Sequence, residues 1–331
     1  MANFRFHILS GLVLGTLIAS ACPLSLPLAI FAPTSAPIPT FTATFTLTPT
    51  ATPTPTPTPT PVARRVLIVS IDGLRPEEIA LVQMHALGNL MTTGAFTVSA
   101  QAVFPSVTMP AHVSMLTGMY PSKHGVTSNQ FDGYAIGPSL FSLAHAAGLK
   151  TDMVASRRFL QQVTDPSDLD GFTFIDDSDT AIARYVAENF PIDFGVLFVY
   201  FHDNDKMGHS SGWPSEEQLS SLEQTDQALD ILLQALDISG LRSETLIFVT
   251  ADHGGHDSTH GSASPEGMPI PWVMAGPGVH HMGLTGPVSI TDTAATAAWS
   301  LGPPLPVEWD GIPVYEAFGL PYQARPTPHC Q

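Results

Sequence analysis

Three uninterrupted apolar runs constrain the fold of this chain more than any other feature of its sequence. They cover residues 66–71, 194–201 and 245–250, the second directly after Asp193, and are rich in β-branched and aromatic side chains. A strand that is apolar at every position has to be buried on both faces, which is typical of parallel sheets flanked by helices. Between the last two runs, residues 216–238 show the period of an amphipathic helix. We therefore expect an α/β fold with a central, mostly parallel sheet and helices on both faces.

Each of the three runs is followed by side chains that can bind a metal. Asp72 follows the first run, Asp205 and His209 follow the second, and Asp252 and His253 follow the third. The sites of α/β proteins lie at the carboxyl ends of the strands. Asp205 and His209 would face the same way on a helical turn, with His202 and Asp203 as competitors. A single Asp would be explained as a helix cap and a single His as a surface residue, but the repetition predicts a site for zinc or a similar ion.

The stretch 104–118 supplies a candidate nucleophile. Residues 98–104 are predicted to form a strand, which Pro105 ends, and Pro110 stands where the first turn of a helix tolerates proline. Thr108 would then lie at a helix N-terminus, where free N–H groups and the helix dipole favour a phosphate. For a lone threonine at this position, the alternative is an N-cap without any chemistry.

The N-terminal part carries targeting signals rather than a fold. Residues 1–21 are predicted to be a signal peptide, and the small residues before Cys22 resemble a bacterial lipobox. Cleavage before Cys22 would leave a lipidated cysteine, while ordinary cleavage or an uncleaved membrane anchor are the alternatives. The rest of the segment 22–62 is a Thr/Pro-rich linker, expected to be disordered and extended. Each alternative exports the remaining part, 63–325, to the cell surface or the extracellular space, with the membrane contacted only through the N-terminus.

Charge and cysteine content exclude several other functions. The net charge of −17 argues against binding to the backbone of a nucleic-acid duplex. The two cysteines, Cys22 and Cys330, are too few for a disulfide framework or a cysteine-based zinc site. No protein partner is evident from the sequence.

These motifs together resemble the type I phosphodiesterase/nucleotide pyrophosphatase family of the alkaline phosphatase superfamily. The matching segments are 68–73, 104–112, 117–118, 121–125, 205–209, 250–255 and 260–261, in the family's order. The resemblance implies an alkaline phosphatase-like single domain over 63–325 that hydrolyses a small phosphate ester. The polar segment 157–178 is expected to form a small cap over the site.

The resemblance further implies two divalent metal ions, zinc being preferred and manganese or another divalent ion the alternative. Asp205, His209 and His260 would hold one ion. Asp72, Asp252 and His253 would hold the other, together with the deprotonated hydroxyl of Thr108. Thr108 would attack phosphorus and form a phospho-threonine intermediate. His256 is the rival of His260 in this set.

Two further features bear on the substrate. The family commonly has asparagine three residues after the nucleophile, where this chain has Ala111, so one contact to a phosphoryl oxygen is missing. Arg157 and Arg158 are candidates for a contact to a phosphate oxygen, with a solvated surface pair as the alternative. Residues 108–112 lack the Cys or Ser and the Arg of a sulfatase motif. We expect a phosphodiesterase or nucleotide pyrophosphatase, with a phosphomonoesterase and a non-catalytic surface lipoprotein that acts as a binding module as the alternatives.

Overall fold

The computed structural model describes residues 61–325. The predictions for the signal peptide, for Cys22, for nearly all of the linker and for Cys330 therefore lie outside the described residues. Among the helices of the described part, none combines the length and the apolar character that crossing a bilayer requires.

In this part of the chain, eight strands form one sheet in the order β4-β3-β5-β1-β6-β7-β2-β8. The strands are β1 (Arg65–Ile71), β2 (Ala95–Gln101), β3 (Lys150–Ala155), β4 (Gly171–Phe174), β5 (Phe194–Phe201), β6 (Thr245–Thr250), β7 (Pro269–Ala275) and β8 (Met282–Gly283). β1 pairs in parallel with β5 on one side and with β6 on the other. β7 runs antiparallel to both of its neighbours, β6 and β2. The sheet is thus mostly parallel, as predicted, and the three apolar runs form adjacent central strands.

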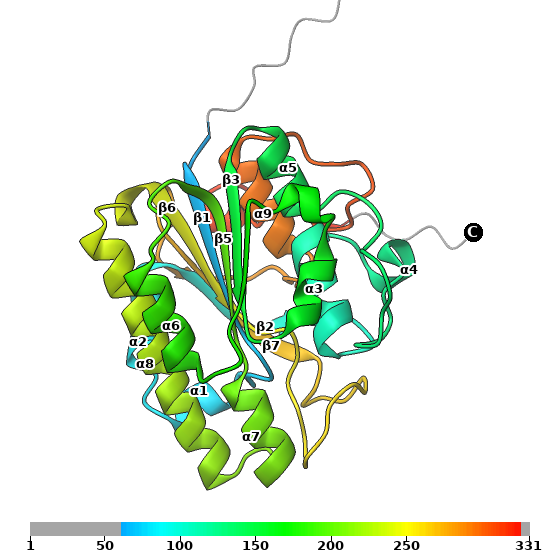
Figure 1. Ribbon diagram of the computed structural model, residues 1–331, viewed down its shortest axis with the longest axis vertical. Coiled ribbons are helices and arrows are strands. Elements are labelled where there is room, and N and C mark those ends of the chain that lie inside the picture. The colour runs from blue at the N-terminus through cyan, green and yellow to red at the C-terminus, as the bar shows by residue number, and fades with distance from the viewer. Residues whose placement is uncertain (1–60, 326–331) are drawn as a thin grey trace, which may run out of the picture. The chain divides into compact units, whose positions relative to one another are not determined.

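Helices cover both faces of this sheet (Figure 1). One layer contains α2 (His85–Thr93), α6 (Asp179–Glu188) and α8 (Glu216–Ile238), with α1 (Glu78–Leu81) and α7 (Asp203–Ser211) towards the bottom of the view. The other layer contains α3 (Thr108–Thr117), α5 (Leu140–Ala146) and α9 (Asp292–Leu301), with α4 (Pro121–His124) farther out. β1 runs from the top of the sheet downwards, so the carboxyl ends of the central strands lie near α7.

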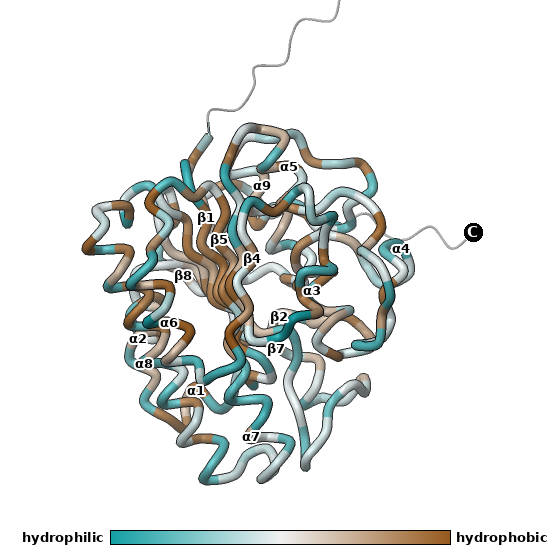
Figure 2. The backbone as a smooth tube through the Cα atoms, in the orientation of Figure 1, coloured by the Kyte–Doolittle hydropathy of each residue, from teal (hydrophilic) through white to brown (hydrophobic). Residues whose placement is uncertain are grey.

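Burial explains why these segments form these elements. Every residue of β5 and β6 is buried, and Figure 2 shows the most apolar colour concentrated in the central strands. Helix α8 buries a stripe that includes Leu222, Leu229 and Leu236 and leaves its opposite face exposed. Each fully buried leucine stabilises the fold by about 1.5–3 kcal/mol. The apolar pattern therefore anchors the sheet and its helices around one core.

Two regions differ from the prediction made from sequence. The segment 157–178, expected as a cap, forms 3₁₀ turns at Arg158–Val163 and Pro166–Asp168 and then the edge strand β4. Each residue of β4 is only half-buried, so the strand lacks the continuous apolar run that marks a central strand. β2 lies three residues earlier than the predicted strand 98–104, because the chain has left the sheet by Phe104, which is 61% exposed.

Candidate active site

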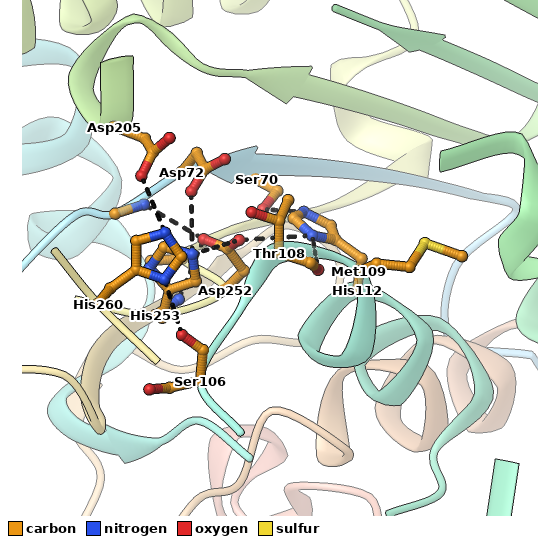
Figure 3. Close-up of polar contacts among 12 residues, drawn as sticks. Ser70, Asp72, Ser106, Thr108, Met109, His112, Asp205, Asp252, His253 and His260 are labelled. Carbon is orange, nitrogen blue, oxygen red and sulfur yellow. Dashed lines mark hydrogen bonds and ion pairs between the residues drawn. The ribbon is translucent and has the colours of Figure 1, made fainter. Parts of the chain in front are cut away.

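The carboxyl ends of three adjacent strands bring the predicted ligands together. Because β5, β1 and β6 are parallel neighbours, the residues that follow them emerge at the same edge of the sheet. Asp72 follows β1, Asp252 and His253 follow β6, His260 lies in the loop between β6 and β7, and α7 carries Asp205 and His209. These side chains form two groups, which we call the buried group and the rim group. Figure 3 shows most of their members converging.

The buried group consists of Asp72, Asp252 and His253, which have no exposed surface. His253 Nε2 lies 3.3 Å from Asp72 Oδ1 and 3.3 Å from Asp252 Oδ2. Among the described residues, none of these three buried atoms has a hydrogen-bond partner. The other carboxylate oxygens are bonded, since Tyr200 donates to Asp72 Oδ2 and the Gly73 N–H donates to Asp252 Oδ1 at 3.2 Å. Buried carboxylate and imidazole atoms that point at one another without a hydrogen-bond partner are typical of a metal site.

The rim group consists of Asp205, His209 and His260. Asp205 Oδ1 is 3.5 Å from His209 Nε2 and 3.7 Å from His260 Nε2. Asp205 is buried, whereas the side chain of His209 is 44% exposed, so this group opens to solvent. His256, the rival of His260, lies 3.1 Å from the exposed carboxylate of Asp257 instead. The structure thus brings His260, rather than His256, to Asp205.

The hydrogen bonds of the three histidines leave the same ring nitrogen free. Nδ1 of His209, His253 and His260 lies 3.0 Å from the backbone carbonyl oxygens of Ser258, Gly254 and Ser106, respectively. A carbonyl only accepts, so Nδ1 carries the proton and Nε2 turns its lone pair towards the carboxylates. Ligands about 2.0–2.2 Å from a tetrahedral zinc ion are about 3.4 Å from one another. The separations of 3.3–3.7 Å within the two groups fit such an ion.

Burial shifts the pKa values of these side chains in directions that favour a bound cation. It raises the pKa of Asp72 well above its usual value, and repulsion from Asp205 and Asp252 adds to the effect. It also raises the pKa of Asp252 and lowers the pKa of His253. Burial and the neighbouring His253 together lower the pKa of His260 to about 4. A divalent cation would offset the clustered negative charge, and neutral imidazole is the form that binds it.

Thr108 is the first residue of α3 and lies beside the buried group (Figure 3). The N-cap of this helix is Val107, which has no side-chain cap bond within the described part of the chain, so the N-cap interpretation of Thr108 is wrong. His112, one turn later, holds the start of the helix. Its Nδ1–H donates to the Thr108 carbonyl at 2.7 Å, and the Ser70 hydroxyl donates to its Nε2 at 2.9 Å. Since His112 Nδ1 is also 3.5 Å from Asp252 Oδ2, α3 is tied to the buried group.

The first turn of α3 offers a phosphate fewer N–H donors than the sequence predicts. Pro110 has none, the Ala111 N–H donates to the Val107 carbonyl at 3.1 Å, and the Met109 N–H donates to Asn129 Oδ1 at 2.8 Å. The Thr108 N–H is the first-turn donor left without a partner among residues 61–325. Ala111 is fully buried in the hydrophobic core, and its methyl group offers no hydrogen bond to a phosphate.

One of the two candidate arginines lies at the site. Burial disfavours the charge of half-buried Arg157, but the neighbouring Tyr200 and Asp72 outweigh this and raise the pKa of Arg157. Arg158 is exposed, and its guanidinium stacks over the ring of Phe174 at 4.1 Å from the centroid. Arg157 thus feels the negative charge of the buried group, whereas the guanidinium of Arg158 is stacked on Phe174.

His202 and Asp203, the competitors for the rim group, make a different contact. Asp179, at the start of α6, accepts from the backbone N–H groups of His202 at 2.7 Å and of Asp203 at 3.3 Å. Asp203 Oδ2 in turn accepts from the Asp179 N–H at 2.9 Å. This reciprocal capping joins the starts of α6 and α7 and leaves Asp205 and His209 to form the rim group.

Two side chains that support the buried group are not predicted from the sequence. Tyr200 places a hydroxyl within the otherwise apolar strand β5, and this interruption was a usable signal. Asn204 Nδ2 donates to the Asp72 backbone carbonyl at 2.9 Å, across 132 positions of sequence. No local sequence pattern predicts the second contact, because only the order of the strands in the sheet brings its two partners together.

Comparison with known proteins places the chain among phosphodiesterases. The family model described as type I phosphodiesterase / nucleotide pyrophosphatase matches residues 66–147 and 146–262. Human ectonucleotide pyrophosphatase/phosphodiesterase family member 5 is 26% identical over 220 residues, which cover 58% of this chain and 45% of that protein. Human bis(5'-adenosyl)-triphosphatase is 23% identical over 215 residues, which cover 57% of this chain and 47% of that protein. The chain thus spans less than half the length of these two relatives.

A solved relative has the same fold. Murine ectonucleotide pyrophosphatase/phosphodiesterase 5, in complex with AMP, matches with a TM-score of 0.63 at 15% identity, over 73% of this chain and 96% of that chain. The family match covers more than half of this chain and includes Thr108 and every member of the buried and rim groups. The chain therefore belongs to the type I phosphodiesterase/nucleotide pyrophosphatase family.

Proposed function

We propose that this chain is an exported phosphoric ester hydrolase that cleaves phosphodiester or nucleotide pyrophosphate bonds with Thr108 as the nucleophile. The position of Thr108 carries the proposal, because it begins α3 next to converging Asp and His atoms that need a positively charged partner. Membership of the family supports hydrolysis of phosphoric esters. A relative named as a diadenosine triphosphatase and a relative solved with AMP support a nucleotide as the substrate.

The buried group and the rim group would each hold one divalent ion, the buried ion together with Thr108 Oγ. Their mixed carboxylate and imidazole donors suit zinc, with manganese as the alternative. When bound, two such ions supply positive charge that lowers the pKa of a nearby hydroxyl and offsets the charge of phosphoryl oxygens.

Thr108 carries out the bond exchange. Its hydroxyl gives up a proton to solvent, and Oγ attacks phosphorus in line, so that an Oγ–P bond forms while the bond to the leaving oxygen breaks. The leaving oxygen takes a proton from water. Water then attacks phosphorus, the Oγ–P bond breaks, and Oγ takes up a proton to become a hydroxyl again. Both steps need Oγ in a fixed place, which the bond from His112 to the Thr108 carbonyl supports.

Arg157 supports a second candidate function, hydrolysis of phosphomonoesters. A monoester carries more negative charge than a diester and gains more from a cation near the reacting phosphorus. Arg157 lies near enough to Asp72 and Asp205 to feel their charges, and Arg158 would contact substrate only after leaving Phe174. Ala111, at the position where the family commonly has asparagine, favours the same alternative because a diester loses one expected contact.

Hydrolysis of bis- and mono-p-nitrophenyl phosphate, after zinc or manganese is added back, decides between the two. We expect the diester to be cleaved faster. A preference for the monoester by orders of magnitude would assign the chain to the phosphomonoesterases. Elemental analysis that finds no bound metal, together with no hydrolysis of either compound, would favour a non-catalytic binding module.

The proposed site of action is outside the cell. The predicted signal peptide 1–21 and the names of the ectonucleotide relatives support export. We propose attachment to the membrane through a lipid on Cys22. Mass spectrometry of the mature N-terminus is expected to find this modified cysteine, whereas a chain that still begins at residue 1 would indicate an uncleaved anchor.

A further inference from the structure

Trp213 follows α7 almost directly and is buried among the segments that carry the ligands. Its residue surface is 5% exposed. Its Nε1–H donates to the Gly73 carbonyl oxygen at 3.2 Å, and its backbone N–H donates to the Asp257 carbonyl oxygen at 2.6 Å. One residue thereby joins the end of α7 to the loop after β1 and to the loop after β6.

Three glycines next to ligands make room for the indole. A Cβ at Gly255 would lie 2.7 Å from the ring, a Cβ at Gly73 would lie 3.1 Å from it, and a Cβ at Gly208 would overlap it outright. Gly73 follows Asp72, Gly208 precedes His209, and Gly255 is the second residue after His253. Three segments that are far apart in sequence therefore pack against the same indole, and each has a glycine at the point of contact.

The indole also forms a wall for the two histidines of the rim group. Its ring lies edge-on to both, with centroids 5.4 Å from His209 and 6.4 Å from His260. His209 depends most on this wall, because its side chain is 44% exposed and is otherwise held by one hydrogen bond, to the Ser258 carbonyl. A histidine on the last turn of a helix would rotate away from Asp205 if this space were empty.

We propose that Trp213 is a positioning residue for the rim group, whose indole sets His209 and His260 at the distance from Asp205 that a divalent ion requires. The inference rests on the proposed function, because it takes the rim group to be a metal site. The indole reaches the buried group only through the Gly73 backbone, whereas strand ends and the bond from Tyr200 to Asp72 hold that group directly. Loss of the indole should therefore weaken ion binding at the rim group and spare the buried group.

Zinc titration of the full chain against a chromophoric chelator tests this inference. Wild type is expected to bind two ions. Trp213→Leu is expected to keep one at wild-type affinity and to bind the other about 10–100-fold more weakly, the usual effect of losing a residue that orients ligands. Trp213→Phe should lie between, since it keeps an aromatic edge but loses the bond to Gly73.

Trp309 provides a matched control. It is 8% exposed, its Nε1–H donates to the Pro138 carbonyl oxygen at 3.0 Å, and a Cβ at Gly118 would lie 2.8 Å from its ring. Trp309→Leu removes the same bulk and a comparable bond away from both groups, so it should lower the melting temperature and leave both zinc affinities unchanged.

Unchanged affinity for both ions in Trp213→Leu, or an equal loss at both groups, would overturn the inference. If Trp213→Leu does not fold, as judged by circular dichroism, Trp213→Phe decides in the same way. A wild-type chain that binds fewer than two ions would contradict the proposed function itself, and this result is separate because it is seen before any substitution.

Discussion

The buried group and the rim group use the same two residue types at the same edge of the sheet, but the fold holds them differently. Asp72, Asp252 and His253 lie within three residues of strand ends and are fully buried. In the rim group, His209 stands on a helix and His260 in a loop, with side chains 44% and 9% exposed. A strand end thus places a ligand through the backbone, whereas a ligand on a helix end or in a loop needs a neighbouring side chain to hold it.

The largest difference between the groups is expected when each loses one histidine. His253→Ala leaves Asp72 and Asp252 buried without their shared partner, so diester hydrolysis should fall by about 10³-fold or more, and added zinc should not restore it. His209→Ala removes a solvent-facing ligand and should weaken ion binding by about 10–100-fold, so excess zinc restores most of the rate. Initial rates over a range of zinc concentrations measure both effects.

His256→Ala is the control for these two variants, because His256 lies in the same loop as His260 but contacts Asp257. It should behave as wild type. Equal losses in His253→Ala and His209→Ala, with the same response to zinc, would show that the two groups do not differ as described.

A smaller effect is expected from the polar layer behind the buried group. Glu78 accepts from Gln218, Gln218 also donates to Asn204, and Asn204 donates to the Asp72 carbonyl. Burial raises the pKa of Glu78 from 4.5 to about 7. The folded state therefore holds a proton that the unfolded state has lost between these pH values, so stability falls as the pH rises through this window and does not return above it.

Glu78→Gln should remove this dependence on pH. The free energy of unfolding of the variant minus that of wild type should therefore be about 3 kcal/mol larger at pH 8 than at pH 4.5. Denaturant unfolding at several pH values, with zinc held constant, measures it. Parallel pH profiles of variant and wild type would mean that Glu78 ionises normally.

The smallest effect is expected at Tyr200, which supports one ligand of the buried group without being a ligand. Tyr200→Phe keeps the ring in the core and removes the bond to Asp72 Oδ2. Zinc affinity of the buried group should fall about tenfold while that of the rim group stays the same. Tyr185→Phe, at a position 39% exposed, serves as the control. A loss of zinc affinity confined to the rim group would contradict the role of Tyr200 at the buried group.

The position of the buried group and of the elements around it could largely be predicted from sequence. Continuous apolar runs marked β1, β5 and β6, and the residues following them, Asp72, Asp252 and His253, converge because parallel neighbours end at one edge. The amphipathic period also predicted α8 at its observed bounds, Glu216–Ile238. These features depend on patterns within a few turns of one element.

The rest depends on contacts between distant segments, which no local pattern contains. Trp213 packs against glycines from three segments, and β4 carries too weak an apolar pattern to be recognised. Asp226, on the polar border of α8, is buried and accepts from the N–H groups of Ala86 and Leu87 at the start of α2. A sequence pattern suggests that such a carboxylate is solvated, since the helix that it caps lies about 140 positions earlier.

We propose that Thr108, which begins α3 beside the buried group, carries the phosphoryl group during turnover. Rapid acid quench of the zinc-loaded protein during hydrolysis of bis-p-nitrophenyl phosphate, followed by peptide mapping, tests it directly. We expect a phosphorylated or nitrophenyl-phosphorylated peptide modified at Thr108, and no such peptide from an inactive Thr108→Ala variant with unchanged metal content. Hydrolysis at the wild-type rate by Thr108→Ala, or modification at another residue, would contradict it.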